Sequence, residues 1–227
     1  MKKKIYPAGL GVNGFYYESN PAIFDAVSNL AVKIHTYKKE YAKNTVLFSG
    51  CGFAVGATKI TVNTALIMSR SYNRTLLIDA DLRKGSALEN GLSDYFIGSA
   101  DINDIIRPTN INNLDFAPSG ARMNSPAMFL CSDKMAEFIE LAKNKYDYVI
   151  INSPPVTSSR DASALFMNAD GIVLVCALNE TTKNQIKRAK NVVCPYAEKY
   201  YGIVVNSMKE NQYKKHFNRR DYYRKLI

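Results

Sequence analysis

Two aspartates and an arginine stand at alternate positions, Asp79, Asp81 and Arg83, at the end of a largely apolar segment that begins at Thr75. Carboxylates at this spacing can hold a magnesium ion or take a proton from a hydroxyl group, and a guanidinium can bind phosphate. The same aspartates could instead cap the turn that follows a strand, which is common for Asp. The adjoining arginine makes the chemical role the better interpretation.

A glycine-containing loop, Gly50 to Thr58, separates a buried segment (Val46 to Phe48) from an apolar-periodic segment that predicts a helix. In the P-loop pattern G-x-x-x-x-G-K-[ST], backbone N–H groups hold phosphates, the lysine neutralises them and the hydroxyl holds magnesium. This loop ends with Gly56, Ala57 and Thr58, so alanine stands where the pattern has lysine. The layout predicts a phosphate site that lacks its main cation.

Six strands are expected to position these residues, with helices between most of them, after a first helix over about Pro21 to Tyr41. The strands are expected at Thr45–Ser49, Thr75–Asp79, Leu114–Pro118, Tyr148–Asn152, Gly171–Ala177 and Gly202–Asn206. Several are apolar throughout rather than alternating, which predicts a parallel α/β sheet with helices on both faces, doubly wound as in P-loop NTPases. Ligands bind such sheets beyond the carboxyl ends of the strands, where Gly50–Thr58, Asp79–Arg83 and Asn152–Pro155 would converge.

The chain has 227 residues and 47% hydrophobic content, which is enough to bury a full core in one domain. We expect a basic N-terminal arm over residues 1–20, the folded domain over 21–207 and a basic, tyrosine-containing tail over 208–227. No apolar run is long enough to cross a bilayer and no signal peptide is recognisable, which predicts a cytoplasmic protein.

Three motifs in order carry a family resemblance: Asp79-Ala80-Asp81-Leu82-Arg83, then Gly91-Leu92-Ser93-Asp94, then the run Tyr146 to Val156 with its Pro154-Pro155 turn. In this order and spacing they resemble the bacterial tyrosine kinases of capsule and exopolysaccharide synthesis, the BY-kinases. The match runs without a gap from about Asn44 to about Asn206. The aspartate motif and the proline turn are also similar to the wider MinD and ParA group of P-loop ATPases.

The resemblance implies roles for individual residues. Asp79 would be the base that takes a proton from a tyrosine hydroxyl, and Asp81 would hold magnesium beside Thr58, so the implied catalytic residues are Asp79 and Asp81. The implied nucleotide-binding residues are Gly52, Gly56, Ala57, Thr58 and Arg83, and the implied metal ligands are Thr58, Asp81 and Asn152. The implied cofactors are ATP and magnesium.

Several positions depart from the family pattern. The family's loop G-E-G-K-S falls on Ala54-Val55-Gly56-Ala57-Thr58, and Asn152 replaces an aspartate that holds the metal through water. Loss of both charges predicts weak nucleotide binding. A two-residue slip could recruit Lys59 instead, although Ile60 would then follow it. In the first helix Asp25, Ser28 and Ala31 stand where the family has an acid and two ring-forming arginines, which favours an ordinary amphipathic helix that packs Ile23, Val27, Leu30 and Ile34 on the sheet.

The segment from Met208 to Ile227 holds seven basic and two acidic residues, and so carries half of the formal net charge of +10. Active family members end in a tyrosine cluster that a neighbouring subunit phosphorylates, and Tyr213, Tyr222 and Tyr223 occupy the comparable region. A basic segment with interleaved aromatic residues could also contact anionic lipid or nucleic acid, or be a solvated end.

Three functional classes stay open. The preferred one is a regulatory pseudokinase of polysaccharide synthesis and export with weak or no ATP-dependent tyrosine phosphorylation, and the second is an active tyrosine autokinase. The third is a membrane- or DNA-associated ATPase of the ParA or MinD kind. The resemblance implies a transmembrane polysaccharide co-polymerase or a paralogous kinase as partner, with an anionic membrane surface favoured over nucleic acid. It implies a cytoplasmic location, peripheral at the inner face of the membrane.

Overall fold

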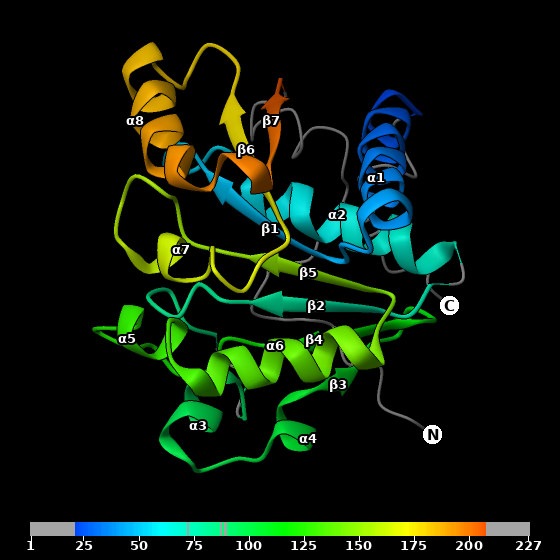
Figure 1. Ribbon diagram of the computed structural model, residues 1–227, viewed down its shortest axis with the longest axis vertical. Coiled ribbons are helices and arrows are strands. Elements are labelled where there is room, and N and C mark those ends of the chain that lie inside the picture. Colours follow the sequence, from blue (N-terminus) through cyan, green and yellow to red (C-terminus); the bar gives the residue numbers. More distant parts are fainter. Residues whose placement is uncertain (1–20, 72, 87, 89, 208–227) are drawn as a thin grey trace, which may run out of the picture.

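The computed structural model describes residues 21–71, 73–86, 88 and 90–207. The basic arm and the tail with Tyr213, Tyr222 and Tyr223 lie outside the described residues. The described chain forms one central sheet with helices on both faces (Figure 1). In chain order the elements are α1 (Pro21–Tyr41), β1 (Thr45–Gly50), α2 (Ala57–Arg70), β2 (Thr75–Asp79), α3 (Leu92–Ile97), α4 (Ile102–Ile105), β3 (Arg107–Pro108), β4 (Leu114–Ala117), α5 (Ala127–Leu130), α6 (Asp133–Lys145), β5 (Tyr148–Asn152), α7 (Asp161–Ala164), β6 (Gly171–Ala177), α8 (Lys183–Val193), the 3-10 helix η3 (Cys194–Lys199) and β7 (Tyr200–Asn206).

The seven strands of this sheet are ordered β3-β4-β2-β5-β1-β6-β7, and every neighbouring pair is parallel except β3 with β4. The prediction of a doubly wound parallel sheet is confirmed. All six expected strands are present, with ends that differ by at most two residues. The short antiparallel strand β3 was not predicted, because two residues, one of them proline, leave no pattern to read.

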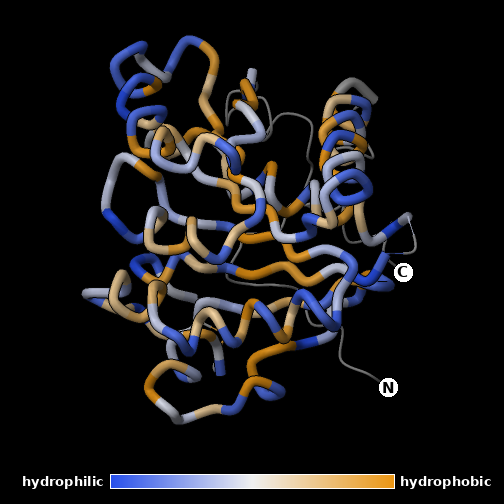
Figure 2. The backbone as a smooth tube through the Cα atoms, in the orientation of Figure 1, coloured by the Kyte–Doolittle hydropathy of each residue, from blue (hydrophilic) through white to orange (hydrophobic). Residues whose placement is uncertain are grey.

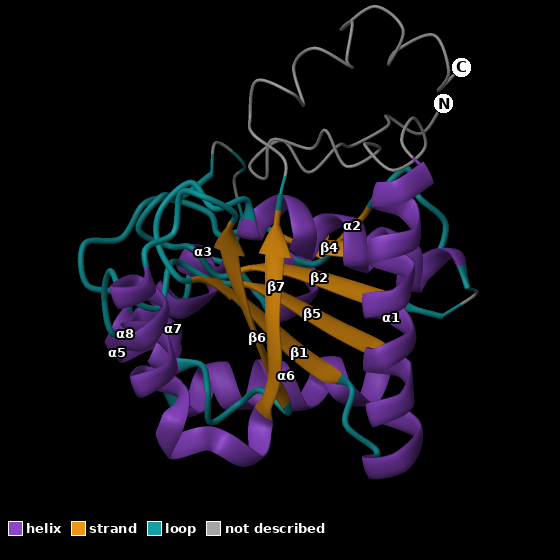
Figure 3. Ribbon diagram, turned by 90° about the horizontal axis from the view of Figure 1, so that it is seen from above, coloured by secondary structure: helices purple, strands orange, loops and turns teal. Residues whose placement is uncertain are grey.

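The strands are apolar throughout because both faces are covered. On β1, the alternate residues Val46 and Phe48 pack with α1 and α2, whereas Leu47 packs in a second cluster with α6 and α8. The hydropathy colouring shows the same arrangement, with hydrophobic strands inside and mixed helices outside (Figure 2). Seen from above, the sheet separates α1 and α2 from α5, α7 and α8 (Figure 3).

The first helix, α1, packs mainly against α2. We expected it to pack on the sheet, so the structure corrects this contact. Val27 and Ile34 are buried as predicted, Ile23 and Leu30 are partly covered, and the ring-forming position Ala31 is only 6% exposed. A contact with the sheet is a hydrogen bond between the His35 ring and the Tyr148 hydroxyl of β5. Position 31 therefore belongs to the core of a single chain.

Candidate functional site

The loop between β1 and α2 turns at a left-handed glycine and leads directly into a helix, which is the order of a phosphate loop. Gly56 has a left-handed φ of 84°, and α2 begins at the next residue, Ala57. The Asn206 amide at the end of β7 donates to the Val55 carbonyl at 3.0 Å, and this hydrogen bond connects the loop to β7. A side chain at Gly56 would meet this amide at 2.4 Å, so glycine is needed there for space as well as for φ. Asn206 was not singled out from the sequence, since nothing near it in the chain points to the loop.

Ala54 holds a strained backbone conformation in this loop. It replaces the first glycine of the family's loop and holds a left-handed φ of 58°. For an L-residue with a Cβ this conformation costs about 1–2 kcal/mol. The backbone of this loop is therefore strained at Ala54.

We expect Ala54→Gly to stabilise the protein by about 0.5–1 kcal/mol, because relief of the left-handed strain exceeds the extra entropy that glycine loses on folding. Urea unfolding of the two proteins measures the difference. Ala136→Gly in α6 is the matched control and should destabilise by about 1 kcal/mol, since its backbone is helical. A destabilised Ala54→Gly variant would show that the strain is not there.

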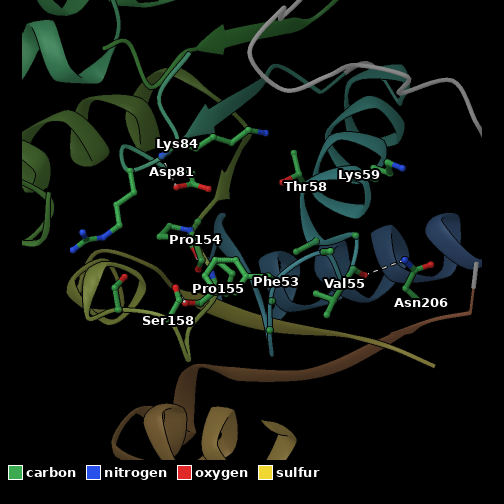
Figure 4. A pocket seen from close by; sticks show the side chains of 18 residues that line it. Phe53, Val55, Thr58, Lys59, Asp81, Lys84, Pro154, Pro155, Ser158 and Asn206 are labelled. Atoms are coloured by element: carbon green, nitrogen blue, oxygen red, sulfur yellow. Dashed lines mark hydrogen bonds between the residues drawn. The ribbon is translucent and has the colours of Figure 1, made fainter. Parts of the chain in front are cut away.

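A pocket of about 860 Å³ lies above the carboxyl ends of β1, β2 and β5. Its wall is formed by the loop from Gly50 to Lys59, by Asp81, Arg83 and Lys84 after β2, and by residues between Ser153 and Ser159 after β5 (Figure 4). The predicted convergence of three segments is therefore confirmed. The volume is within the usual range for small-molecule sites.

Thr58 and Asp81 face each other across this pocket (Figure 4). The Asp81 carboxyl is partly buried, and burial raises its pKa although the charges of Lys84 and Arg83 act in the opposite direction. Lys59 lies on the next position of α2 and points away from Asp81. Both Thr58 and Lys59 line the pocket, and α2 starts at Ala57, so the slip that would recruit Lys59 stays an alternative.

Asp79 and Asn152 lie beneath the pocket rather than on its wall. They are neighbours on paired strands, 3% and 2% exposed, and the Asn152 amide donates to Asp79 Oδ1 at 2.8 Å. Burial raises the pKa of Asp79 to about 6, while the bonds from Asn152 and from the Asp81 backbone act to lower it. Asn152 is thus the hydrogen-bond partner of Asp79, at the position where the resemblance implies an aspartate. The role of Asp79 as a base stays a prediction.

Arg83 reaches the pocket but its guanidinium is engaged elsewhere. It forms a bidentate ion pair with the buried Asp161 at the start of α7 and donates to the Asn124 carbonyl at 3.0 Å. Ser159 also donates to Asp161, at 2.8 Å. Arg83 therefore ties the segment after β2 to the segment after β5, and its predicted contact with nucleotide stays a prediction.

The oxygen donors fit a magnesium–nucleotide complex in part. Magnesium in nucleotide sites takes one or two carboxylates and keeps water and phosphate as its other ligands, a role that Asp81 and Thr58 can fill. Among the described residues, the buried Asn152 Oδ1 has no hydrogen-bond partner, as expected of an atom that faces a bound water. The same part of the chain holds no group of three or more His, Cys, Asp or Glu residues arranged for a metal ion. The donors present, Asp81 and Thr58, therefore fit a metal that a bound nucleotide helps to hold.

Comparison with known proteins supports the family that the sequence motifs resemble. The family model of the AAA domain matches residues 50–199. The tyrosine-protein kinase CpsD of Streptococcus agalactiae is 34% identical over 166 residues, which cover 69% of this chain and 72% of CpsD. The tyrosine-protein kinase wzc of Salmonella typhimurium is 28% identical over 191 residues, which cover 81% of this chain but only 27% of wzc.

Solved structures of a bacterial tyrosine kinase domain and of MinD superpose on this chain. The kinase domain of the Escherichia coli tyrosine kinase ETK superposes with a TM-score of 0.79 and 25% identity, over 92% of this chain and 83% of that domain. MinD of Pyrococcus horikoshii, solved with Mg-ADP, has a TM-score of 0.60, 18% identity and 77% coverage of both chains, and so shares the fold. The chain belongs to the AAA-domain family and, within its MinD- and ParA-like P-loop ATPases, to the bacterial tyrosine kinases.

Proposed function

We propose that this chain is a regulatory BY-kinase of capsular or exopolysaccharide synthesis and export, which binds magnesium–nucleotide weakly and does not phosphorylate tyrosine by itself. The observation that carries the proposal is the pocket itself. Its loop turns at the left-handed Gly56 into the N-terminus of α2, yet Ala57 stands at the position of the neutralising lysine. The relatives named as tyrosine kinases supply the family context.

Phosphoryl transfer requires the charge on the transferred group to be neutralised as it moves. A bound magnesium ion would supply part of that charge. Thr58 and Asp81 would position it, and the N-terminus of α2 would orient N–H groups toward the phosphates. Asp79 would have to reach the acceptor hydroxyl from beneath the pocket wall, where it is 3% exposed. Binding is therefore better supported than transfer.

The partners follow from the family and are part of the proposal. A transmembrane polysaccharide co-polymerase, or a paralogous kinase with an intact loop, would be the protein that this chain regulates. Among the described residues, no helix is both long and apolar enough to span a bilayer. In this proposal the partner, or contact with anionic lipid, attaches the chain at the inner face of the membrane.

Mass spectrometry after incubation of the purified protein with magnesium and ATP tests this function. We expect no phosphotyrosine at Tyr213, Tyr222 or Tyr223, because the loop lysine that stabilises the transferred phosphoryl group is replaced by Ala57. An intact relative incubated alongside serves as the positive control. Phosphotyrosine in the unmodified protein that disappears in Asp79→Asn would contradict the proposal.

That outcome would support the second candidate, an active tyrosine autokinase. One observation favours it: the pKa of Asp79 near 6 is suitable for a general base at neutral pH. We place this candidate second because a general base cannot by itself replace the loop lysine that is missing at Ala57.

A further inference from the structure

Lys84 lies on the wall of the pocket opposite the phosphate loop. Its side chain extends from the segment after β2 into the space between Asp81 and Thr58 (Figure 4). Neither the motif pattern nor the resemblance singled this residue out. Its ammonium group is a cation directed at the part of the pocket where a phosphate held by the N-terminus of α2 would lie.

Two hydrogen bonds to Asp81 hold the backbone at Lys84 and Gly85. The N–H of Lys84 donates to Asp81 Oδ1 at 3.2 Å, and the N–H of Gly85 donates to the Asp81 carbonyl at 3.0 Å. Gly85 has a left-handed φ of 67°, and a side chain there would meet the Arg122 backbone at 2.8 Å. The tight turn therefore positions Lys84 relative to Asp81, the proposed magnesium ligand.

Among the described residues, two other cations line the pocket, Arg83 and Lys59. Arg83 is paired with Asp161, and Lys59 points away from Asp81 (Figure 4). Among the described residues, no carboxylate lies within ion-pair distance of the Lys84 ammonium. Its charge still acts on the carboxyl groups of Asp79 and Asp81 and lowers the pKa of each, so the ammonium lies close to both without being bound by either. Lys84 is thus placed to bind an anion that enters between the two walls.

We propose that Lys84 binds the phosphates of a nucleoside di- or triphosphate from the wall opposite the loop and supplies the positive charge that Ala57 cannot supply. The inference deepens the proposed function, since it rests on the chain having kept weak nucleotide binding. It assigns the residual affinity to a cation that reaches the phosphates from the segment after β2. A lysine is suited to this role because its flexible stem carries a compact charge that needs no fixed geometry.

Calorimetry of the full chain with Mg-ADP tests the assignment by binding alone. Lys84→Met keeps most of the side-chain length and removes the charge, and should raise the Kd about tenfold or more. Lys84→Arg should stay within about threefold of the unmodified protein, since the charge is retained. Lys190→Met, at an exposed position in the last turn of α8, is the matched control for the loss of one positive charge and should leave the Kd unchanged.

A double-mutant cycle with Ala57→Lys separates a phosphate contact from a general loss of charge. When Ala57 is lysine, loss of Lys84 should cost much less than it does in the unmodified protein, because the two ammonium groups neutralise the same phosphates. Equal costs in both backgrounds would overturn the inference. So would an unchanged Kd in Lys84→Met, or the absence of measurable Mg-ADP binding in the unmodified protein. None of these results depends on phosphotyrosine, whose appearance would instead contradict the proposed function.

Discussion

Ala57→Lys is expected to tighten Mg-ADP binding by about thirty- to a hundredfold, a gain of about 2–3 kcal/mol. Ala57 is the first residue of α2 and lines the pocket, so a lysine there starts from the backbone position that the P-loop pattern gives it. Charge-assisted contacts with phosphate are among the strongest that a side chain makes. The site already has the loop backbone, the hydroxyl of Thr58 and the carboxylate of Asp81, so one added charge should act on a nearly complete site.

Ala57→Met is the matched control, because methionine has nearly the length of lysine without its charge. It should bind Mg-ADP no better than the unmodified protein, and the gain of Ala57→Lys should shrink as salt is added. If the two variants bind equally well, the missing charge is not what weakens the site. The loop shape itself would then be at fault, with Ala54 as the next residue to reverse.

The fold could be predicted almost completely from the sequence because it depends on patterns that are local. Continuous apolar runs such as Gly171 to Ala177 mark strands that are covered on both faces, and their order along the chain gives the parallel arrangement. The convergence of the three loops follows from that arrangement alone. The contact of α1 with α2 could not be predicted in the same way, since an apolar helix face does not say what covers it.

The side-chain partners in the site were much less predictable. The sequence indicates that Asn152 is a lost charge and that Arg83 is a phosphate ligand, since those residue types stand at family positions. The structure shows the Asn152 amide bonded to Asp79 and the Arg83 guanidinium paired with Asp161. Both partners come from strands or loops distant in the chain, and their choice depends on register and on side-chain packing. No local spacing encodes them.

Asp79→Asn is expected to stabilise the folded protein by about 3 kcal/mol at pH 7.5. Asp79 is buried, and burial raises its pKa from the ordinary 3.8 to about 6. Above pH 6 the folded protein must hold a buried carboxylate that the unfolded chain would expose to water, and each pKa unit corresponds to about 1.4 kcal/mol. Asparagine removes this cost. The hydrogen bonds from the Asn152 amide and from the Asp81 N–H both go to Oδ1, an oxygen that asparagine keeps.

The sign of the pH dependence distinguishes this cause from better packing. A raised pKa means that the folded state binds the proton more tightly, so the destabilising effect of Asp79 grows as pH rises from about 4 to about 6 and is constant above that. The gain of Asp79→Asn should therefore fall to about half at pH 5, as measured by urea unfolding at the two pH values. Asp25→Asn, on the exposed side of α1, should give no gain at either pH.

A gain that is the same at pH 5 and at pH 7.5 would mean that the buried carboxylate carries no electrostatic cost, and that the Asn152 amide compensates it fully. The expected result has a functional meaning for the site. A buried acid that destabilises the fold at neutral pH is what a site with a chemical task retains, whereas a residue that merely capped a turn would cost nothing to keep ionised. Stabilisation by Asp79→Asn would therefore favour the chemical role of Asp79 over the turn-capping role that the sequence left as the alternative.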